Sequence, residues 1–570
     1  MSTAERLSPE YRTAALRRLE QEELDVLVIG GGVVGAGAAL DAATRGLRTG
    51  LVEARDYAAG TSSRSSKLFH GGLRYLEQFD FGLVFEALRE RSLVLGTLCP
   101  HLARPVPFIY PLQRRIDRPY VGLGIGVYDV MGAGRGVPGH HRHLGRRKTA
   151  ESFPSGKRSA IRGSVRFYEG QVDDARHTMM LARTAATYGA LCVTSTRVTE
   201  FLRESDRIAG VRVRDLEDGR EFTVRAQQVV NAAGIWTDEI QAMVGGRGQF
   251  QVRASKGVHL VVPRNRINSA TGIITRTEKS LLFVIPWGSH WIIGTTDTDW
   301  DLDLAHPAAS RTDIDYLLEH ANSLLQDPLT REDVVGVYAG LRPLLSGESE
   351  STSKLSREHA VASPVRGLTV IAGGKYTTYR VMAEDAVDSA VHGLERTVPA
   401  SVTDRTPLVG ADGYRAAYNA RRLTAERTGL PVSAVEHLLG RYGTLSGELF
   451  DLIAEHPELA EPLRSAPEYL RVEAHYAASH EGALHLDDVL TRRTRISIEV
   501  PDRGEAAARE VADIVAPLLG WDAEHVDREV EHYRLRVQAE RESQEQLDDR
   551  TADAARLGAP DVRMGATSMA

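Results

Sequence analysis

The segment from residue 25 to residue 53 constrains the fold more than any other part of this chain. A short apolar run, Asp25 to Ile29, leads directly into the glycine-rich run Gly30-Gly-Gly-Val-Val-Gly35. Gly30, Gly32 and Gly35 have the G-x-G-x-x-G spacing, which makes a tight turn, leaves room for a pyrophosphate and lets a helix approach a strand. A second apolar run, Arg48 to Glu53, ends on an acidic residue. We therefore predict a βαβ unit with strands over 25–29 and 48–53, a glycine turn over 30–37 and a helix over 38–45.

This unit predicts a dinucleotide site. The helix N-terminus faces the pyrophosphate with unpaired N–H groups. Glu53, at the end of the second strand, can accept hydrogen bonds from both ribose hydroxyls, which argues against the 2′-phosphate of NADP. Both FAD and NAD fit the glycine spacing.

Three later segments favour FAD. The run from Thr61 to Leu68 is rich in hydroxyl groups, and Val229 to Gly234 resembles the second strand–glycine signature of two-dinucleotide-binding flavoproteins. Ala372 to Thr378 places a glycine pair before a predicted helix, whose N-terminus can stabilise negative charge on a reduced flavin. The residues that we expect to hold FAD are Gly30, Gly32, Gly35, Glu53, Thr61, Ser62, Ser63, Ser66, Lys67, Leu68, Val198, Ala233, Gly234, Gly373, Lys375, Tyr376 and Thr377.

A chain of 570 residues is too long for one hydrophobic core. Strand-like runs alternate with helical ones up to about residue 400, and mostly helical periodicity follows. The expected class is α/β, with a Rossmann-like FAD-binding domain, an inserted antiparallel β-sheet substrate domain and a C-terminal helical domain. We place a charged extension at 1–22, the two interleaved domains at 23–400, the helical domain at 404–545 and a loose tail at 547–570.

Charge, cysteine content and apolar patterning argue against several classes of protein. The net charge of −7 disfavours a general nucleic-acid binder, and the two cysteines, Cys99 and Cys192, have no disulfide or metal spacing. The N-terminus has no apolar signal region, and the longest apolar stretch, Val26 to Leu40, is shorter than a bilayer span. We therefore expect a protein of the cytoplasm, and no metal.

Several runs together resemble the FAD-dependent, quinone-linked glycerol-3-phosphate dehydrogenases. The most specific run is Ser65-Ser-Lys-Leu-Phe-His-Gly-Gly-Leu-Arg-Tyr-Leu76, and Lys256-Gly-Val-His259, Ile293-Gly-Thr-Thr-Asp297, Gly340-Leu-Arg-Pro343 and Gly373-Gly-Lys-Tyr-Thr-Thr-Tyr-Arg380 support it. The resemblance covers about residues 22–530, and the helical part looks like the cap domain of that family. Val258 and Tyr376 stand where the family often has a small hydroxyl residue and a leucine.

The resemblance implies oxidation of sn-glycerol 3-phosphate to dihydroxyacetone phosphate, with hydride transfer from C2 to flavin N5. Substrate-phosphate positions of the family match Arg74, Tyr75, Arg357 and Lys375, and cationic side chains suit such a dianion. His259 is our first candidate for the base because histidine titrates near neutral pH. His70 is an alternative, Arg342 would stabilise negative charge on O2, and Asp297 ranks below them.

Residues 104–148 form a basic stretch. Nine basic residues and two acidic ones give it about +7, and apolar residues lie between the charges. Such a pattern suits an anionic membrane surface, and in the family this region is implicated in membrane binding. We expect peripheral association with the inner face of the cytoplasmic membrane, a menaquinone or ubiquinone as acceptor, and a homodimer.

Two alternative functions remain open at this point. A glycerol-3-phosphate oxidase would have the same substrate site, but would pass electrons to O₂ and form hydrogen peroxide. Use of an FAD fold on RNA or in a non-enzymatic role is disfavoured by the net negative charge and by the phosphate-binding motif. A solvated loop is the alternative to the membrane surface at 104–148.

Overall fold

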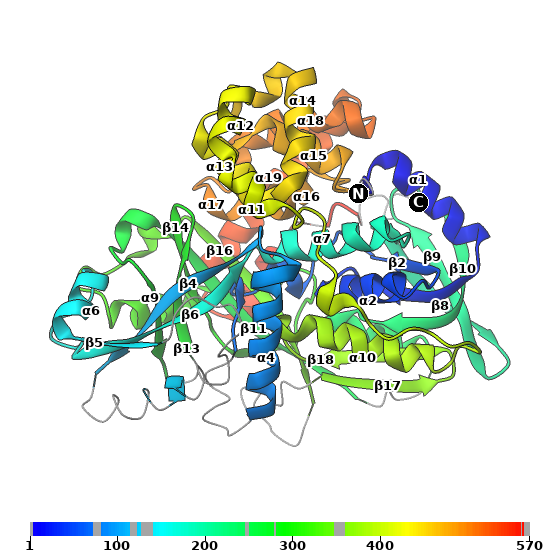
Figure 1. Cartoon of the computed structure of the whole chain (residues 1–570), viewed down its shortest axis with the longest axis horizontal. Coiled ribbons are helices and arrows are strands. Elements are labelled where there is room, and N and C mark those ends of the chain that lie inside the picture. The colour runs from blue at the N-terminus through cyan, green and yellow to red at the C-terminus, as the bar shows by residue number, and fades with distance from the viewer. Residues whose placement is uncertain are drawn as a thin grey trace.

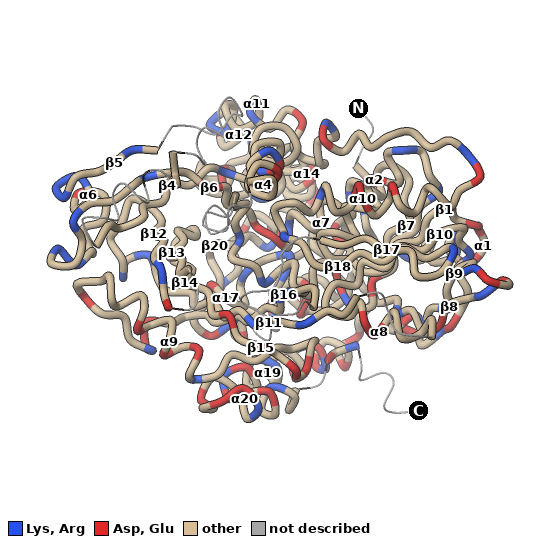
Figure 2. Tube along the Cα trace, turned by 90° about the horizontal axis from the view of Figure 1, so that it is seen from below, with Lys and Arg blue, Asp and Glu red and all other residues tan. Residues whose placement is uncertain are grey.

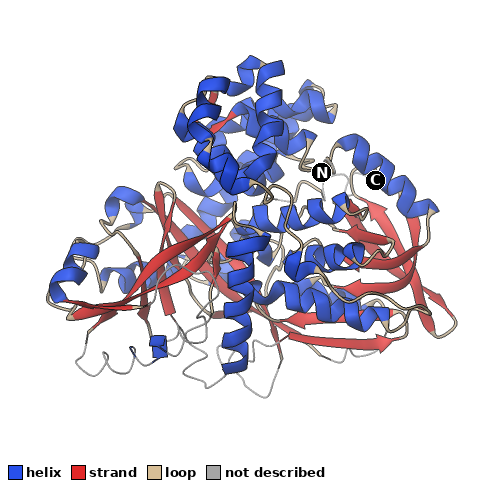
Figure 3. Ribbon diagram, viewed as in Figure 1, coloured by secondary structure: helices blue, strands red, loops and turns tan. Residues whose placement is uncertain are grey.

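The structure is a computed structural model that describes residues 4–71, 81–113, 122, 124–126, 141–245, 250–278, 281–346, 359–559 and 561–563. Figure 1 shows two β-sheet units side by side, with a helical unit above them. In Figure 3 the helical unit is almost entirely blue, whereas the two lower units contain the red strands. The architecture confirms the expected α/β class with an interleaved β-sheet unit and a C-terminal helical unit.

An eight-stranded sheet forms the nucleotide-binding unit, and its central strand order is β17-β18-β10-β1-β2-β7. The strands are β1 (Leu24–Ile29), β2 (Thr49–Val52), β7 (Leu191–Val193), β8 (Thr196–Glu204), β9 (Arg207–Asp215), β10 (Glu221–Asn231), β17 (His359–Val365) and β18 (Leu368–Gly373). All six residues of β1 are buried, as expected for a parallel strand covered on both faces. Val26 and Val28 pack with the helices α2 (Val33–Thr44), α7 (Asp174–Thr187) and α10 (Tyr379–Val391) on one face. Leu27 and Ile29 pack on the opposite face, together with α1 (Pro9–Gln21).

Two boundaries within this unit differ from the prediction. Helix α2 begins at Val33 rather than at residue 38, because only the residues up to Gly32 form the turn and Gly35 lies within the helix. The strand of the strand–glycine run expected from Val229 begins earlier and ends at Asn231, as part of one long strand, β10. Its first half pairs antiparallel with β9, and its second half pairs parallel with β1. One continuous strand therefore has two different partners.

A ten-stranded sheet forms the second unit, with the main order β15-β11-β14-β13-β12-β4-β6-β3. Its strands are β3 (Leu68–Phe69), β4 (Ala103–Leu112), β5 (Arg142–Gly145), β6 (Gly163–Val172), β11 (Val252–Pro263), β12 (Gly272–Arg276), β13 (Leu281–Trp287), β14 (His290–Gly294), β15 (Thr298–Trp300) and β16 (Gly336–Leu345). Helices α4 (Phe81–Leu93) and α6 (Arg146–Ser152) lie between β2 and β7 in sequence, and α8 (Thr237–Ala242) and α9 (Arg311–Asn322) lie between β10 and β17. Strands β3–β6 lie between β2 and β7 in sequence, and β11–β16 lie between β10 and β17, so the chain enters this sheet twice.

Helices dominate the third unit. They are α11 (Tyr414–Asn419), α12 (Arg421–Thr428), α13 (Val432–Tyr442), α14 (Ser446–Glu455), α15 (Arg471–Ser479), α16 (Leu486–Asp488), α17 (Ile496–Glu499), α18 (Glu505–Leu519), α19 (Ala523–Glu545) and α20 (Asp549–Arg556). The short strands β19 (Pro462–Leu463) and β20 (Ala466–Leu470) pair with each other.

Buried ion pairs join the helical unit to the nucleotide-binding unit. Asp56, which follows β2, accepts hydrogen bonds from Arg492 Nε at 2.6 Å and from Arg493 Nη1 and Nη2 at 2.7 Å. Arg495 reaches both Asp173 at 2.5 Å and Asp174 at 2.6 Å, at the start of α7. Because all these side chains are buried, the interface depends on charge pairing within a low-dielectric environment.

The C-terminal segment corrects one expectation. We predicted a loose tail over 547–570, but α20 spans Asp549–Arg556. Asp549 lies 2.5 Å from the buried Nζ of Lys256, which also contacts Asp313 at 2.6 Å. Farther along, Arg563 is buried and forms an ion pair with Asp488 at 2.8 Å. These partners are distant in sequence, so local composition did not reveal them.

Within the described part of the chain, no helix combines the length and the apolar character that a bilayer crossing requires.

Candidate active site

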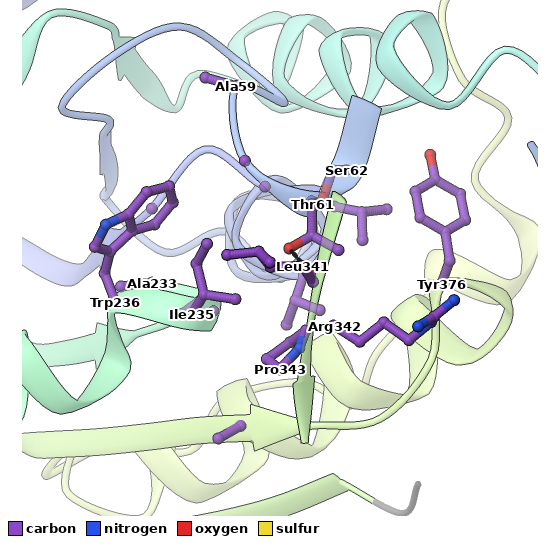
Figure 4. A pocket seen from close by; sticks show the side chains of 18 of the residues that line it. Ala59, Thr61, Ser62, Ala233, Ile235, Trp236, Leu341, Arg342, Pro343 and Tyr376 are labelled. Atoms are coloured by element: carbon purple, nitrogen blue, oxygen red, sulfur yellow. Dashed lines mark hydrogen bonds between the residues drawn. The ribbon is translucent and has the colours of Figure 1, made fainter. Parts of the chain in front are cut away.

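A cavity of about 510 Å³ lies between the two sheets. Its nucleotide-binding wall consists of the segments that follow β1, β2, β10 and β18, that is, the carboxyl ends of parallel strands, where ligands bind in such sheets. The opposite wall comes from β11 and β16 of the second sheet. Figure 4 shows Trp236 and Tyr376 on opposite sides of the cavity, with Leu341 and Arg342 of β16 between them. The volume is within the range of cofactor sites.

The turn after β1 is built for close approach of backbone groups. Gly30 has φ +108°, and a Cβ there would lie 2.7 Å from the carbonyl oxygen of Ala232. A Cβ at Gly35 would lie only 1.9 Å from the carbonyl oxygen of Gly30. Gly32 lines the cavity at the N-terminus of α2, and the N–H of Val33 donates to Ser62 Oγ at 2.9 Å. This arrangement fits the pyrophosphate of FAD at the N-terminus of α2.

Glu53 lies at the end of β2 and lines the same cavity. The backbone N–H of Gly31 donates to its Oε2 at 2.6 Å, and the N–H of Arg55 donates to its Oε1 at 2.8 Å. Burial raises the pKa of the Glu53 carboxyl, and these two hydrogen bonds oppose that shift. Each oxygen retains acceptor capacity for a ribose hydroxyl.

Most of the residues predicted to hold FAD lie together in the cavity wall. They are Gly30, Gly32, Glu53, Thr61, Ser62, Ser66, Leu68, Val198, Ala233, Gly234, Gly373, Lys375, Tyr376 and Thr377. Gly35, Ser63 and Lys67 do not line it. Gly35 acts at the contact between α2 and the glycine turn, whereas Lys67 Nζ donates to Asp174 at 2.7 Å and to the carbonyl of Ser63 at 3.1 Å. The buried Lys67 side chain therefore connects the hydroxyl-rich loop to α7.

His259 reaches the cavity from β11. Its Nε2 lies 2.9 Å from Ser66 Oγ, and its ring stacks on Tyr338 with a centroid distance of 4.7 Å. Burial, and then the positive charges of Arg342 and Lys67, lower the pKa of His259 well below its usual value. The imidazole is therefore neutral near pH 7, which is the form that accepts a proton.

Arg342 of β16 lines the cavity near His259, and its guanidinium is held in place by several oxygen atoms. Nη2 donates to Thr295 Oγ1 and to the carbonyl of Thr296, both at 3.1 Å. Nη1 lies 3.4 Å from Asp297 Oδ1. Asp297, our lower-ranked candidate base, does not line the cavity and instead holds Arg342.

The other predicted catalytic and substrate-binding residues divide into two groups. His70 and Lys375 line the cavity, and backbone groups of His70 bond to Thr377 Oγ1 at 3.2 Å in both directions. Arg74, Tyr75 and Arg357 lie outside the described residues.

Several cavity residues were not predicted from the sequence. Trp236 lines the cavity beside Gly60, where an added Cβ would lie 3.0 Å from the indole ring. Arg55 and Arg64 also line the cavity. Trp236 follows Gly234 by two positions and Arg55 follows Glu53 by two positions, so proximity to these motifs was an available signal. Leu341 approaches the site because its carbonyl accepts a hydrogen bond from Thr61 Oγ1 at 2.6 Å (Figure 4).

Family profiles match most of the chain. The profile described as FAD dependent oxidoreductase matches residues 25–380, and the profile described as C-terminal domain of alpha-glycerophosphate oxidase matches residues 401–526.

Individual proteins agree with these profiles. The chain is 59% identical over 561 residues to a glycerol-3-phosphate dehydrogenase of Mycobacterium leprae, covering 98% of this chain and 96% of that protein. It is 34% identical over 569 residues to the mitochondrial glycerol-3-phosphate dehydrogenase of Homo sapiens, covering 95% and 77%. A solved structure of the glycerol-3-phosphate dehydrogenase from Bacillus halodurans, complexed with FAD, superposes with a TM-score of 0.78, at 29% identity and with coverage of 93% and 98%.

The glycine turn, the cavity and the comparisons agree on one cofactor, and they confirm the prediction of FAD. The match extends through both β-sheet units and the helical unit. The chain belongs to the FAD-dependent glycerol-3-phosphate dehydrogenases.

Proposed function

We propose that this flavoenzyme oxidises sn-glycerol 3-phosphate to dihydroxyacetone phosphate and passes the electrons to a membrane quinone. The observation that carries the proposal is the convergence of His259, Arg342 and Lys375 on the wall of the FAD cavity. A neutral imidazole, a fixed guanidinium and an ammonium group in one site match a substrate with a secondary alcohol and a phosphate.

The cationic side chains orient the substrate in this proposal. Lys375 lies next to the glycine pair Gly373-Gly374, and its ammonium group binds the substrate phosphate as a point charge. Arg74, Tyr75 and Arg357 complete the phosphate site, as the family resemblance implies. Arg342, whose guanidinium is held by Thr295, Thr296 and Asp297, stabilises negative charge that develops on O2.

His259 takes the proton of the C2 hydroxyl. Its low pKa keeps the imidazole unprotonated before the reaction, and Ser66 Oγ at 2.9 Å fixes the ring orientation. Bound FAD supplies the hydride acceptor, N5 of the flavin. The dianionic phosphate of the substrate raises the proton affinity of His259 once it is bound.

His259→Ala tests this assignment. We expect a loss of at least about 100-fold in kcat, the usual contribution of a general base, with FAD content unchanged. His70→Ala tests the alternative base in the same assay, and His392→Ala is the matched control because His392 is exposed at the end of α10. Unchanged turnover in a folded, FAD-loaded His259→Ala enzyme contradicts the role of His259.

Surface features support an anionic membrane as the place of electron transfer. Arg142, Arg146, Arg147 and Lys148 are exposed on β5 and α6, and Figure 2 shows these cationic segments at one end of the molecule. Phe81 and Phe85, in the first turns of α4, are 47% and 45% exposed. Basic groups attract anionic headgroups, and exposed aromatic rings enter the interfacial region.

Two experiments test the acceptor and the membrane. Under anaerobic conditions glycerol 3-phosphate should bleach the flavin, and a quinone analogue should restore its colour much faster than air does. Rapid reoxidation by air with stoichiometric hydrogen peroxide instead supports the oxidase alternative.

The enzyme should float with anionic vesicles at low salt and dissociate at high salt, and absence of flotation contradicts the membrane role. The homodimer stays a prediction.

A further inference from the structure

A second, smaller cavity lies where the helical unit meets the nucleotide-binding unit. Its volume is about 50 Å³, several times the roughly 10–15 Å³ that one water molecule requires. Arg55, Ala59 and Arg64 line both this cavity and the FAD cavity. The opposite wall comes from α19, α20 and the segment around residue 561.

Cationic side chains dominate the lining of this cavity, which we call the arginine cavity. Among the described residues, six arginines and three carboxylates line it, and they are Arg55, Arg64, Arg492, Arg536, Arg556 and Arg563, with Asp487, Glu529 and Asp561. Figure 2 shows charged positions of both signs along α19 and α20. The lining therefore carries a formal excess of positive charge before neighbouring groups are considered.

Most of these arginines have a carboxylate partner. Arg55 pairs with Asp561 at 2.9 Å, Arg563 pairs with Asp488 at 2.8 Å, and Arg536 lies 3.2 Å from Glu540. Arg492 is hydrogen-bonded to Asp56, Asp487 and Asp488. These pairs leave little positive charge uncompensated at four of the six arginines.

Arg64 and Arg556 differ from the others. Within the described residues, the Arg64 guanidinium bonds to the backbone carbonyl of Ala305 at 3.2 Å and has no carboxylate partner. Arg556 is 4% exposed, its Nη1 has no hydrogen-bond partner among the described residues, and its Nη2 lies 3.4 Å from Glu540, a carboxylate that it shares with Arg536. A guanidinium whose charge is only partly compensated in such a site is costly, and a bound anion lowers that cost.

The pKa values of Arg64 and Arg556 are both lowered. Burial and the neighbouring charges of Arg536 and Arg55 lower the pKa of Arg64 to about 9. Burial lowers the pKa of Arg556 to about 10. Planar guanidinium groups that converge on one space suit a tetrahedral oxyanion, because each can donate two hydrogen bonds.

We propose that the arginine cavity is a binding site for a small phosphate-class oxyanion, held by Arg64 and Arg556 in the FAD-loaded enzyme. The ligand is either free inorganic phosphate or the phosphate group of a small metabolite. This site is separate from the N-terminus of α2, where the FAD pyrophosphate is expected, and from Lys375, where the substrate phosphate is expected. The proposal therefore does not depend on the identity of the substrate or of the electron acceptor.

The test uses FAD-loaded Lys375→Gln enzyme as the parent, because inorganic phosphate could otherwise bind in the substrate site. Phosphate is titrated at constant ionic strength against chloride by isothermal titration calorimetry, in a buffer without other oxyanions. We expect one saturable site in the parent. Adding Arg64→Gln should weaken phosphate binding at least about tenfold, since it removes a charged donor.

Two further variants make the result specific. Arg556→Gln should weaken phosphate binding in the same way, and it replaces Arg64→Gln if that variant loses FAD. Arg366→Gln is the matched control, because Arg366 pairs with Asp206 on the surface and its side chain is 76% exposed. This control should bind phosphate as the parent does.

Three results would overturn the proposal. The first is absence of saturable phosphate binding in the parent. The second is equal binding by the parent and by both Arg64→Gln and Arg556→Gln. The third is binding that occurs only after FAD is removed, which would show that the cofactor's own phosphates fill the site.

Discussion

Replacing Gly35 by alanine tests the close packing between α2 and the glycine turn of the FAD site. The added Cβ would lie 1.9 Å from the carbonyl oxygen of Gly30, and contacts shorter than 3.0 Å are essentially never seen. Helix α2 and the glycine turn must therefore separate by more than about 1 Å. Both contacting groups belong to the backbone or are fixed to it, so no side chain can move aside. We expect a loss of about 3 kcal/mol, at the upper end of the range for overpacked cores.

Two matched variants separate packing from helix propensity and from cofactor contact. Gly440→Ala lies inside α13, where a Cβ meets nothing within 4 Å, so alanine should stabilise the helix by up to about 1 kcal/mol. Gly32→Ala brings a Cβ to 3.3 Å from Ser62 Oγ, so the protein should fold but hold FAD more weakly.

The assay is flavin content after purification, followed by chemical denaturation. A loss of 3 kcal/mol lowers the folded-to-unfolded ratio by more than about 100-fold, and Gly35→Ala should also lose FAD because the α2 N-terminus is displaced. If Gly35→Ala keeps the flavin content and the denaturation midpoint of the wild type, the close approach of α2 to Gly30 is not real.

Three further predictions concern charge. Arg342→Gln removes a positive charge that lowers the pKa of His259, so that pKa should rise and the acidic limb of the kcat/KM profile should move to higher pH; an unmoved limb contradicts the assignment. Lys256→Met leaves two carboxylates of α9 and α20 without their shared cation and should cost about 3–5 kcal/mol in urea denaturation, whereas wild-type stability would show that this contact is dispensable. Asp56→Asn weakens the hydrogen bonds and ion pairs that Arg492 and Arg493 make with this side chain. Limited proteolysis should then release the helical unit faster than in the wild type.

The local pattern around residues 25–53 determined a large part of the fold. Alternating apolar strands, the glycine spacing and the final acid predicted β1, β2 and the dinucleotide site, because each of these depends on residues that are neighbours in sequence. The predicted start of α2 was too late, because the glycines inside this helix have the composition of a turn.

The pairing of strands and charges that are distant in sequence could not be predicted from the local pattern. Nothing in the local pattern of β10 showed that it continues from one partner strand to another, since strand pairing is set by which strands lie beside it. Lys67 illustrates the same limit, because its place in a hydroxyl-rich loop indicated a cofactor ligand, whereas Asp174, more than a hundred residues away, binds its ammonium group.

The sequence by itself thus determined the nucleotide fold, the cofactor and, through the resemblance, the reaction class and its candidate residues. Only the tertiary structure decided which of those side chains meet, that Asp297 supports Arg342 rather than lining the cavity, and that the segment after residue 547 folds as α20 against Lys256. The physical reason is that backbone conformation and hydrophobic patterning are read from neighbouring residues. Buried charge pairing instead joins residues hundreds of positions apart, and its energy depends on burial that only the complete fold provides.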